Sequence, residues 1–140
     1  MNDADRKALA GIFAAHSYIQ AALVFGSFAK GKLGFDSDLD VAVLSSAPLD
    51  AKQTIDLMGD LGSQFGRPVD VIDLFTQHGA IAREAFTKGE LVYCRDRLAY
   101  AERMRRMLYD EADFLPILRS ADRMAIEKWL KTSYVQKSAH

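Results

Sequence analysis

The stretch GSFAKGKLGFDSDLD, which runs from Gly26 to Asp40, joins a glycine-rich turn to a pair of aspartates. It follows AALVF at 21–25, a short unbroken apolar run that is typical of a strand buried on both faces. It leads into 38–44, where apolar residues alternate with Asp38 and Asp40 and predict a second strand. About a dozen residues separate the two strands, too few for a full crossover helix, so we expect a mixed sheet.

The rest of the chain alternates between helical and extended patterns. The predicted elements are a helix over 3–16, strands over 21–25 and 38–44, a helix from Pro48 to Gly66, a strand over 69–74, a helix over 78–88, a strand over 91–94 and one or two helices over 97–131. The helix that ends at Gly66 carries Ile55, Met58, Leu61 and Phe65 at helical spacing. This order predicts an α/β fold in which a small mixed β-sheet is flanked by helices.

The composition is that of an ordinary globular chain, with 49% hydrophobic and 26% charged residues. The length of 140 residues suits a single domain over 1–140. A net charge of −1 gives no overall attraction to nucleic acid, so we expect no direct nucleic-acid binding. The first residues lack the pattern of a signal peptide, and no apolar run approaches the ~18–20 residues of a membrane span. We therefore expect a cytoplasmic protein that does not contact a membrane.

Two familiar kinds of site share part of this stretch but do not fit its chemistry. A P-loop needs Ser or Thr after its lysine, because that hydroxyl binds the magnesium of the nucleotide, and this position holds Leu33. An EF-hand needs Gly at its sixth position and Glu at its twelfth, and these positions hold Val41 and Ala47. Neither a P-loop nor a calcium loop is therefore favoured.

A third interpretation accounts for the whole stretch. Alternation along a strand places Asp38 and Asp40 on the same face, ~6.5–7 Å apart along the backbone. Two carboxylates this close repel each other, and a hard cation such as Mg²⁺ relieves the repulsion. Gly26 and Ser27 follow the first strand with exposed amides, which favour phosphate oxygens at the start of a helical turn. Together these residues predict a site for a nucleoside triphosphate with its magnesium.

The spacing of Gly-Ser, ten residues and Asp-x-Asp resembles the signature of the nucleotidyltransferase superfamily, which has the polymerase-beta-like fold. The letters GSFAKG and SDLDVAV are similar to those of its smallest members, the minimal nucleotidyltransferases (MNT). These are best known as antitoxins of HEPN–MNT toxin–antitoxin pairs, and the resemblance covers essentially the whole chain. Lys30 departs from the arginine of many relatives. It or Lys32 keeps a cation near the phosphates, but a lysine lacks the bidentate contact of an arginine.

The resemblance implies a magnesium-dependent enzyme that transfers AMP from ATP to a hydroxyl, with two Mg²⁺ ions held by Asp38 and Asp40. It implies a protein partner, a HEPN ribonuclease toxin that is silenced when a tyrosine is adenylylated. The family uses a third carboxylate from a neighbouring strand, for which PVDVIDL offers Asp70 and Asp73. These two have opposite parity on the strand, so at most one faces the metals. We favour Asp70, because relatives carry the third acid near the start of this strand.

Two alternative functions are kept open. The first is an antitoxin that blocks its toxin by binding alone and keeps a vestigial site, although the intact Gly-Ser and acidic residues argue against decay. The second is a small-molecule nucleotidyltransferase of the aminoglycoside type, although such relatives usually carry an added helical domain. The helices expected over 97–131, with the basic residues Arg103, Arg105 and Arg106, are the expected partner-binding part.

Overall fold

The three-dimensional structure is a computed structural model that describes residues 1–31 and 37–110. Its elements in chain order are α1 (Asp3–Ala15), β1 (Ile19–Phe25), α2 (Gly26–Ala29), β2 (Leu39–Ser45), α3 (Ala51–Phe65), β3 (Val69–Asp73), α4 (Ala80–Lys88), β4 (Glu90–Cys94) and α5 (Arg97–Asp110). They confirm the predicted α/β order, with boundaries that differ from the predicted ones by one to three residues in most elements. The helical residues expected beyond residue 110 lie outside the described part of the chain.

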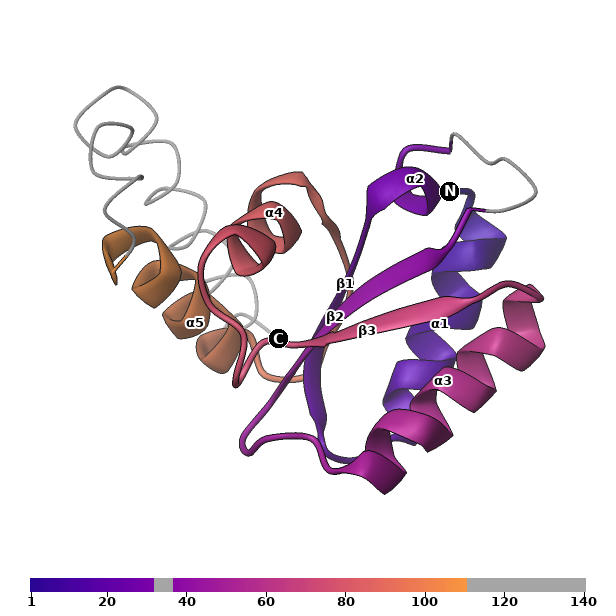
Figure 1. The fold of residues 1–140 in the computed structure, drawn as a ribbon, viewed down its shortest axis with the longest axis horizontal. Helices are drawn as coiled ribbons and strands as arrows, with labels where there is room; N and C mark the ends of the chain where they lie inside the picture. The colour runs from indigo at the N-terminus through magenta and orange to yellow at the C-terminus, as the bar shows by residue number, and fades with distance from the viewer. Residues whose placement is uncertain (32–36, 111–140) are drawn as a thin grey trace, which may run out of the picture. The chain divides into compact units, whose positions relative to one another are not determined.

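The four strands form one mixed sheet in the order β3-β2-β1-β4 (Figure 1). β1 pairs antiparallel with both β2 and β4, whereas β2 and β3 pair in parallel. The short connection after β1 allows an antiparallel return, and α3 supplies the crossover that the parallel pair of β2 and β3 requires. The mixed sheet expected from the spacing of the first two strands is therefore confirmed.

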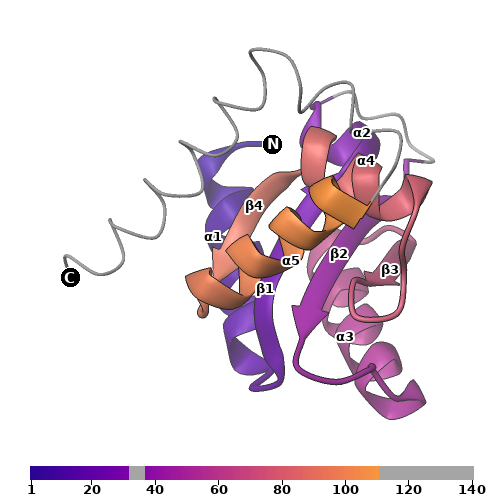
Figure 2. The ribbon, with the colours of Figure 1, turned by 90° about the vertical axis from the view of Figure 1, so that its left-hand side faces the viewer.

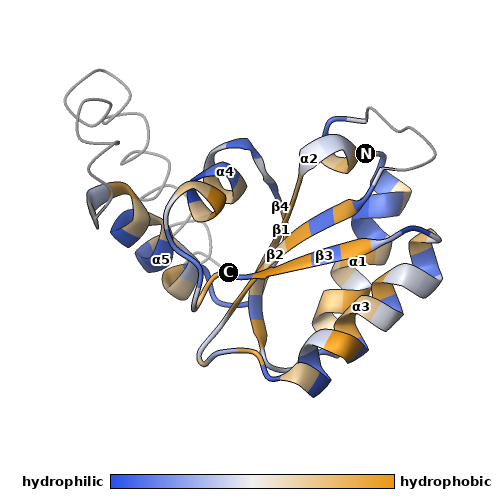
Figure 3. Ribbon diagram, in the orientation of Figure 1, coloured by the Kyte–Doolittle hydropathy of each residue, from blue (hydrophilic) through white to orange (hydrophobic). Residues whose placement is uncertain are grey.

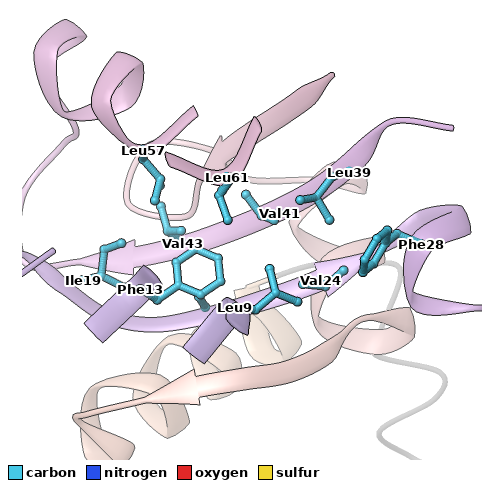
Figure 4. Close-up of a cluster of buried hydrophobic side chains, with 11 residues drawn as sticks. Leu9, Phe13, Ile19, Val24, Phe28, Leu39, Val41, Val43, Leu57 and Leu61 are labelled. Carbon is cyan, nitrogen blue, oxygen red and sulfur yellow. The ribbon is translucent and has the colours of Figure 1, made fainter. Parts of the chain in front are cut away.

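The helices α1 and α3 cover one face of the sheet and enclose the hydrophobic core (Figure 4). The buried cluster consists of Leu9, Phe13, Ile19, Ala22, Val24, Phe28, Leu39, Val41, Val43, Leu57 and Leu61. Colouring by hydropathy shows the strands as largely apolar, in line with burial of the sheet (Figure 3). Helix α4 lies on the opposite face and contacts β1, and Figure 2 shows the sheet from this side. In the described residues of the unit Met1–Arg95, helices thus cover both faces of the sheet.

The residues that α3 buries are only partly those whose helical spacing predicted this helix. Leu57 and Leu61 are fully buried, whereas Ile55 is 67% exposed and Met58 is 38% exposed. Residues four apart lie on the same side of a helix, so Leu57, Leu61 and the half-buried Phe65 form the stripe that faces the sheet. The sheet decides which of two possible apolar stripes is buried, and the helical period alone does not.

The chain divides into two units, 1–95 and 96–140, which are described separately. The second unit begins with Asp96, whose side chain accepts a hydrogen bond from the backbone N–H of Ala99 at 3.0 Å at the start of α5. The expectations of a single domain over the whole chain and of a partner-binding part over 97–131 stay predictions. No helix within the described ranges has the length and hydropathy that a bilayer crossing requires.

Candidate active site

The turn after β1 brings backbone amides to one end of the sheet. β1 ends at Phe25, and Gly26–Ala29 form the single helical turn α2. Gly26 has a φ of 72°, in the left-handed region that favours glycine, and a Cβ atom there would overlap Oδ2 of Asp40. Glycine is therefore needed both for the backbone conformation and for the approach of the Asp40 carboxylate. Ser27, the next residue, is exposed.

Asp38 and Asp40, at the start of β2, lie at the same end of the sheet as the turn after β1. Asp40 pairs with Phe25 on β1 and with Asp70 on β3. Residues paired across neighbouring strands project to the same face of a sheet, as do alternate residues along a strand. Asp40, Asp70 and Asp38, which directly precedes β2, thus share one face, opposite the core formed with α1 and α3. We call these three residues the acidic face.

The negative charges of the acidic face act on Asp40 in particular. Burial raises the pKa of the Asp40 carboxyl above its ordinary value, and the charges of Asp70, Asp38 and Glu84 raise it further. Within the described residues, no side-chain or backbone donor offsets this effect by a hydrogen bond to the carboxylate. The surroundings therefore disfavour the ionised form of Asp40, and a cation bound beside it would stabilise that form.

The donor set of the acidic face suits a hard divalent cation. Mg²⁺ prefers oxygen ligands such as the carboxylates of Asp38, Asp40 and Asp70, and two of these are paired across neighbouring strands. Over residues 1–31 and 37–110, no three His, Cys, Asp or Glu side chains converge closely enough to form a metal site. The acidic face thus fits Mg²⁺ because it offers oxygen ligands on one face of the sheet. The carboxylates do not, however, converge on one point.

Asp73, the other candidate for the third acid, has a different environment. It pairs with Val43 of β2, whose side chain belongs to the core, so strand parity turns Asp73 away from the acidic face. Its Oδ2 accepts a hydrogen bond from the backbone N–H of Leu49 at 2.9 Å, and its Oδ1 accepts one from that of Phe75 at 2.9 Å. Asp73 therefore fixes the loops after β2 and β3, while Asp70 is the aspartate of β3 on the acidic face.

The two lysines expected near the phosphates are described to different extents. Lys30 is the exposed residue that ends α2, and its backbone N–H donates to the carbonyl oxygen of Gly26 at 3.4 Å. Lys32 belongs to the segment 32–36, which lies outside the described residues. A role of either lysine in phosphate binding stays a prediction.

Two further residues near the site were not predicted from the sequence. Glu84 of α4 adds a negative charge to the surroundings of Asp40, and Arg67 donates a hydrogen bond to the carbonyl oxygen of Ser37 at 3.2 Å. Glu84 belongs to no sequence motif. It comes near Asp40 through the packing of α4 against the sheet, which the sequence around Glu84 does not indicate. Arg67 stands in the segment GRPV, which is typical of the end of a helix and carries no functional signal.

Comparison with known proteins gives a family and a curated relative. The sequence profile of the family described as polymerase beta, nucleotidyltransferase, matches residues 7–98. The protein adenylyltransferase MntA of Shewanella oneidensis (strain MR-1) is 29% identical over 75 residues, which make up 54% of this chain and 54% of that protein. The chain thus matches about half the length of this relative.

Solved structures share the fold over most of the chain. A crystal structure described as a toxin-antitoxin with AMP-PNP has a TM-score of 0.64 at 22% identity, over 82% of this chain and 96% of the other. A structure of a tri-AMPylated Shewanella oneidensis HEPN toxin in complex with an MNT antitoxin has a TM-score of 0.60 at 20% identity, over 85% and 97% of the two chains. At these identities the likeness establishes the fold, which is the polymerase-beta-like fold expected from the sequence.

Proposed function

The chain belongs to the polymerase beta nucleotidyltransferase family, and from this premise we propose that it is an antitoxin that transfers AMP from ATP to a hydroxyl of a HEPN-type toxin. The observation that carries the proposal is the approach of Asp40, which faces Asp70 across parallel strands, to the turn at Gly26. The relative MntA is named a protein adenylyltransferase, and one similar structure contains an AMPylated HEPN toxin. Both support the same reaction.

The turn after β1 is the proposed binding place of the triphosphate. Backbone amides of Gly26 and Ser27 donate to phosphate oxygens, and the Ser27 hydroxyl, on an exposed residue, adds a donor. Lys30 and Lys32 contribute positive charge to the same anion. The acidic face lies next to this turn, because the Asp40 carboxylate occupies the space in which a side chain at position 26 would lie.

The acidic face is the proposed magnesium site, with Asp38, Asp40 and Asp70 as ligands. When bound, two Mg²⁺ ions would supply stabilisation of the negative charge on the reacting phosphates and a lower pKa for the attacking hydroxyl. Support comes from the position of Asp38, Asp40 and Asp70 on one face and from the raised pKa of Asp40, whose charged form such a cation would stabilise. Asp38 and Asp70 are both exposed, and we assign Asp70, on the neighbouring strand β3, the contact with the acceptor group.

The proposed reaction is an in-line displacement at the α-phosphorus of ATP. The acceptor oxygen forms a bond to this phosphorus, the bond from phosphorus to the bridging oxygen breaks, and pyrophosphate leaves with the electron pair. The hydroxyl proton passes to the carboxylate of Asp70 and from there to solvent. Most of the rate enhancement is expected from positioning and from electrostatic stabilisation of the displaced charge.

The proposed acceptor is a tyrosine of the toxin, and the proposed binding part is the segment 97–131. In its described portion, α5 exposes Arg105, Arg106 and Tyr109, and arginine and tyrosine are enriched in protein interfaces. Arg103 is buried, so the basic trio expected from the sequence does not form one exposed surface. We infer that the protein acts in the cytoplasm, the compartment that supplies ATP.

Co-expression with a HEPN-type toxin, followed by mass spectrometry of that toxin, tests the proposed function. The wild-type chain should add about 329 Da per transferred AMP, and Asp38→Ala should bind the toxin without adding mass. If the wild type neutralises the toxin without any added mass, and Asp38→Ala neutralises it equally well, the chain is a binding-only antitoxin.

A further inference from the structure

One neighbouring segment holds the backbone on both sides of Asp38. On one side, Nη1 of Arg67 donates to the carbonyl oxygen of Ser37 at 3.2 Å. On the other, the backbone N–H of Leu39 donates to the carbonyl oxygen of Pro68 at 2.8 Å. Because the residues before and after Asp38 are both fixed to this segment, the direction in which its carboxylate leaves the backbone is fixed as well.

Arg67 is itself fixed by the turn that follows β1. Its guanidinium carbon lies 5.5 Å from the ring centroid of Phe28, within the range of a cation–π contact. Phe28 is buried in α2 and packs edge to face against Phe65 at the end of α3, with ring centroids 5.4 Å apart. The same guanidinium therefore contacts the proposed phosphate turn and the backbone that leads into Asp38.

We propose that Arg67 is a positioning residue, which sets the place of Asp38 relative to α2 by binding both. The proposal rests on the proposed nucleotidyltransferase site. Arg67 acts through the Ser37 carbonyl and not through the carboxylates, because Phe28 and Phe65 pack with the core on the face of α1 and α3. The acidic face lies on the other side of the sheet.

Arginine has properties that this position uses together. Its guanidinium is planar and carries N–H donors around its edge. One flat side can therefore contact an aromatic ring while the edge donates a hydrogen bond. Lysine keeps the charge and a donor but loses the planar contact, and methionine keeps apolar volume over Phe28 but donates nothing. Arg67→Met thus removes the bond to Ser37, and Arg67→Lys restores part of it.

The first measurement is the affinity for Mn²⁺ alone, followed by electron paramagnetic resonance of the free ion. We expect Arg67→Met to weaken Mn²⁺ binding about tenfold, the lower end for loss of a group that orients a metal ligand, and Arg67→Lys to weaken it less. The matched control is Arg95→Met. Arg95 also donates through Nη1 to a serine carbonyl, that of Ser17 at 2.6 Å, but from beyond the other end of β1. Arg95→Met should bind Mn²⁺ as the wild type does.

The second measurement is hydrogen–deuterium exchange of the backbone around Asp38, which requires no transfer activity. We expect Arg67→Met to speed exchange of the Leu39 amide, because its hydrogen bond to the Pro68 carbonyl lies next to the lost bond between Arg67 and Ser37. Arg95→Met should leave this exchange unchanged. Thermal unfolding of each variant shows whether the fold persists. If Arg67→Met does not fold, Arg67→Lys is used with the same two measurements.

The outcomes separate this inference from the proposed function. Weaker Mn²⁺ binding and faster exchange in a folded Arg67 variant support the positioning role, even if the wild type transfers no AMP to any partner. A folded variant that binds Mn²⁺ with wild-type affinity overturns it. An equal loss of Mn²⁺ affinity in Arg95→Met also overturns it, because the effect would then be general destabilisation.

Discussion

The two aspartates of β3 lie three residues apart and have contrasting surroundings. Asp73 accepts hydrogen bonds from two backbone N–H groups, those of Leu49 and Phe75. Asp70 lies opposite Asp40, and its charge raises the pKa of the Asp40 carboxyl. A carboxylate that receives its donors from the protein stabilises the fold, whereas two carboxylates that face each other oppose folding. We propose that a bound cation offsets the repulsion in the second arrangement, and on this basis we assign Asp73 a structural role and Asp70 a functional one.

Among the variants that test this contrast, the largest effect is expected for Gly26→Ala, which displaces Asp40, the residue paired with Asp70. The new Cβ overlaps Oδ2 of Asp40 and requires a left-handed backbone that alanine disfavours. We expect AMP transfer to fall about a hundredfold, the cost of moving a reacting group by roughly 1 Å. The free energy of unfolding should fall by about 1–3 kcal/mol. Transfer assays and urea unfolding measure the two effects.

Gly59→Ala is the matched control for Gly26→Ala. Gly59 lies within α3, and an added Cβ there meets no atom of the described residues within 4 Å. This substitution should raise the free energy of unfolding by about 0.5–1 kcal/mol and leave transfer unchanged, since alanine favours a helix interior over glycine. Full transfer by Gly26→Ala would show that the approach of Gly26 to Asp40 is no part of the site.

A smaller pair of effects tests the two aspartates directly. Asp70→Asn should lower AMP transfer about tenfold or somewhat more, as loss of one metal-site group does, with little change in stability. Asp73→Asn should lower the free energy of unfolding by about 1–2 kcal/mol, because an amide keeps one acceptor oxygen for two backbone donors. Its transfer per folded molecule should match the wild type. If Asp73→Asn loses more transfer than Asp70→Asn, the third acid has been assigned to the wrong residue.

The smallest effect is expected in the stability of Asp40→Asn without metal. Burial and like charges raise the pKa of Asp40 in the folded state, so the folded protein binds this proton more tightly than the unfolded chain does. The ionised carboxylate thus costs stability at neutral pH, and Asp40→Asn should raise Tm by about 2 °C in EDTA at pH 7. The difference should shrink as the pH falls through the raised pKa of Asp40 toward the ordinary range of an aspartate, because the wild type then takes up the proton. A lower Tm at pH 7, as expected for Asp73→Asn, would contradict this account.

Local patterns in the sequence predicted much of this fold, because a strand and a turn are marked by neighbouring residues. The alternation around Asp40 predicted β2 and the face shared with Asp38. Parity predicted that Asp70 and Asp73 lie on opposite faces, and the pairing of β2 with β3 agrees. The roles of these residues in metal binding stay predictions.

Features that depend on tertiary contacts could not be predicted in the same way. Ile55 and Met58 have the helical spacing of buried residues, but the sheet lies on the side of Leu57, and no local rule says so. Arg67 binds a backbone carbonyl thirty residues earlier in the chain, at Ser37, and any residue type offers such an acceptor. The contact therefore leaves no pattern in the sequence.

The parallel pairing of β2 with β3 has a consequence for the order in which the site assembles. β1 and β2 are antiparallel neighbours, so a short hairpin can bring Gly26 to Asp40 early in folding. Asp70 joins them only after the chain has closed a longer loop through α3, a slower step because its entropy cost comes before its contacts form. A chain arrested at the hairpin would hold the turn and one acidic pair but lack the third carboxylate. Under the proposed function, AMP transfer would therefore begin only when the crossover is complete, and a partly folded chain would transfer none.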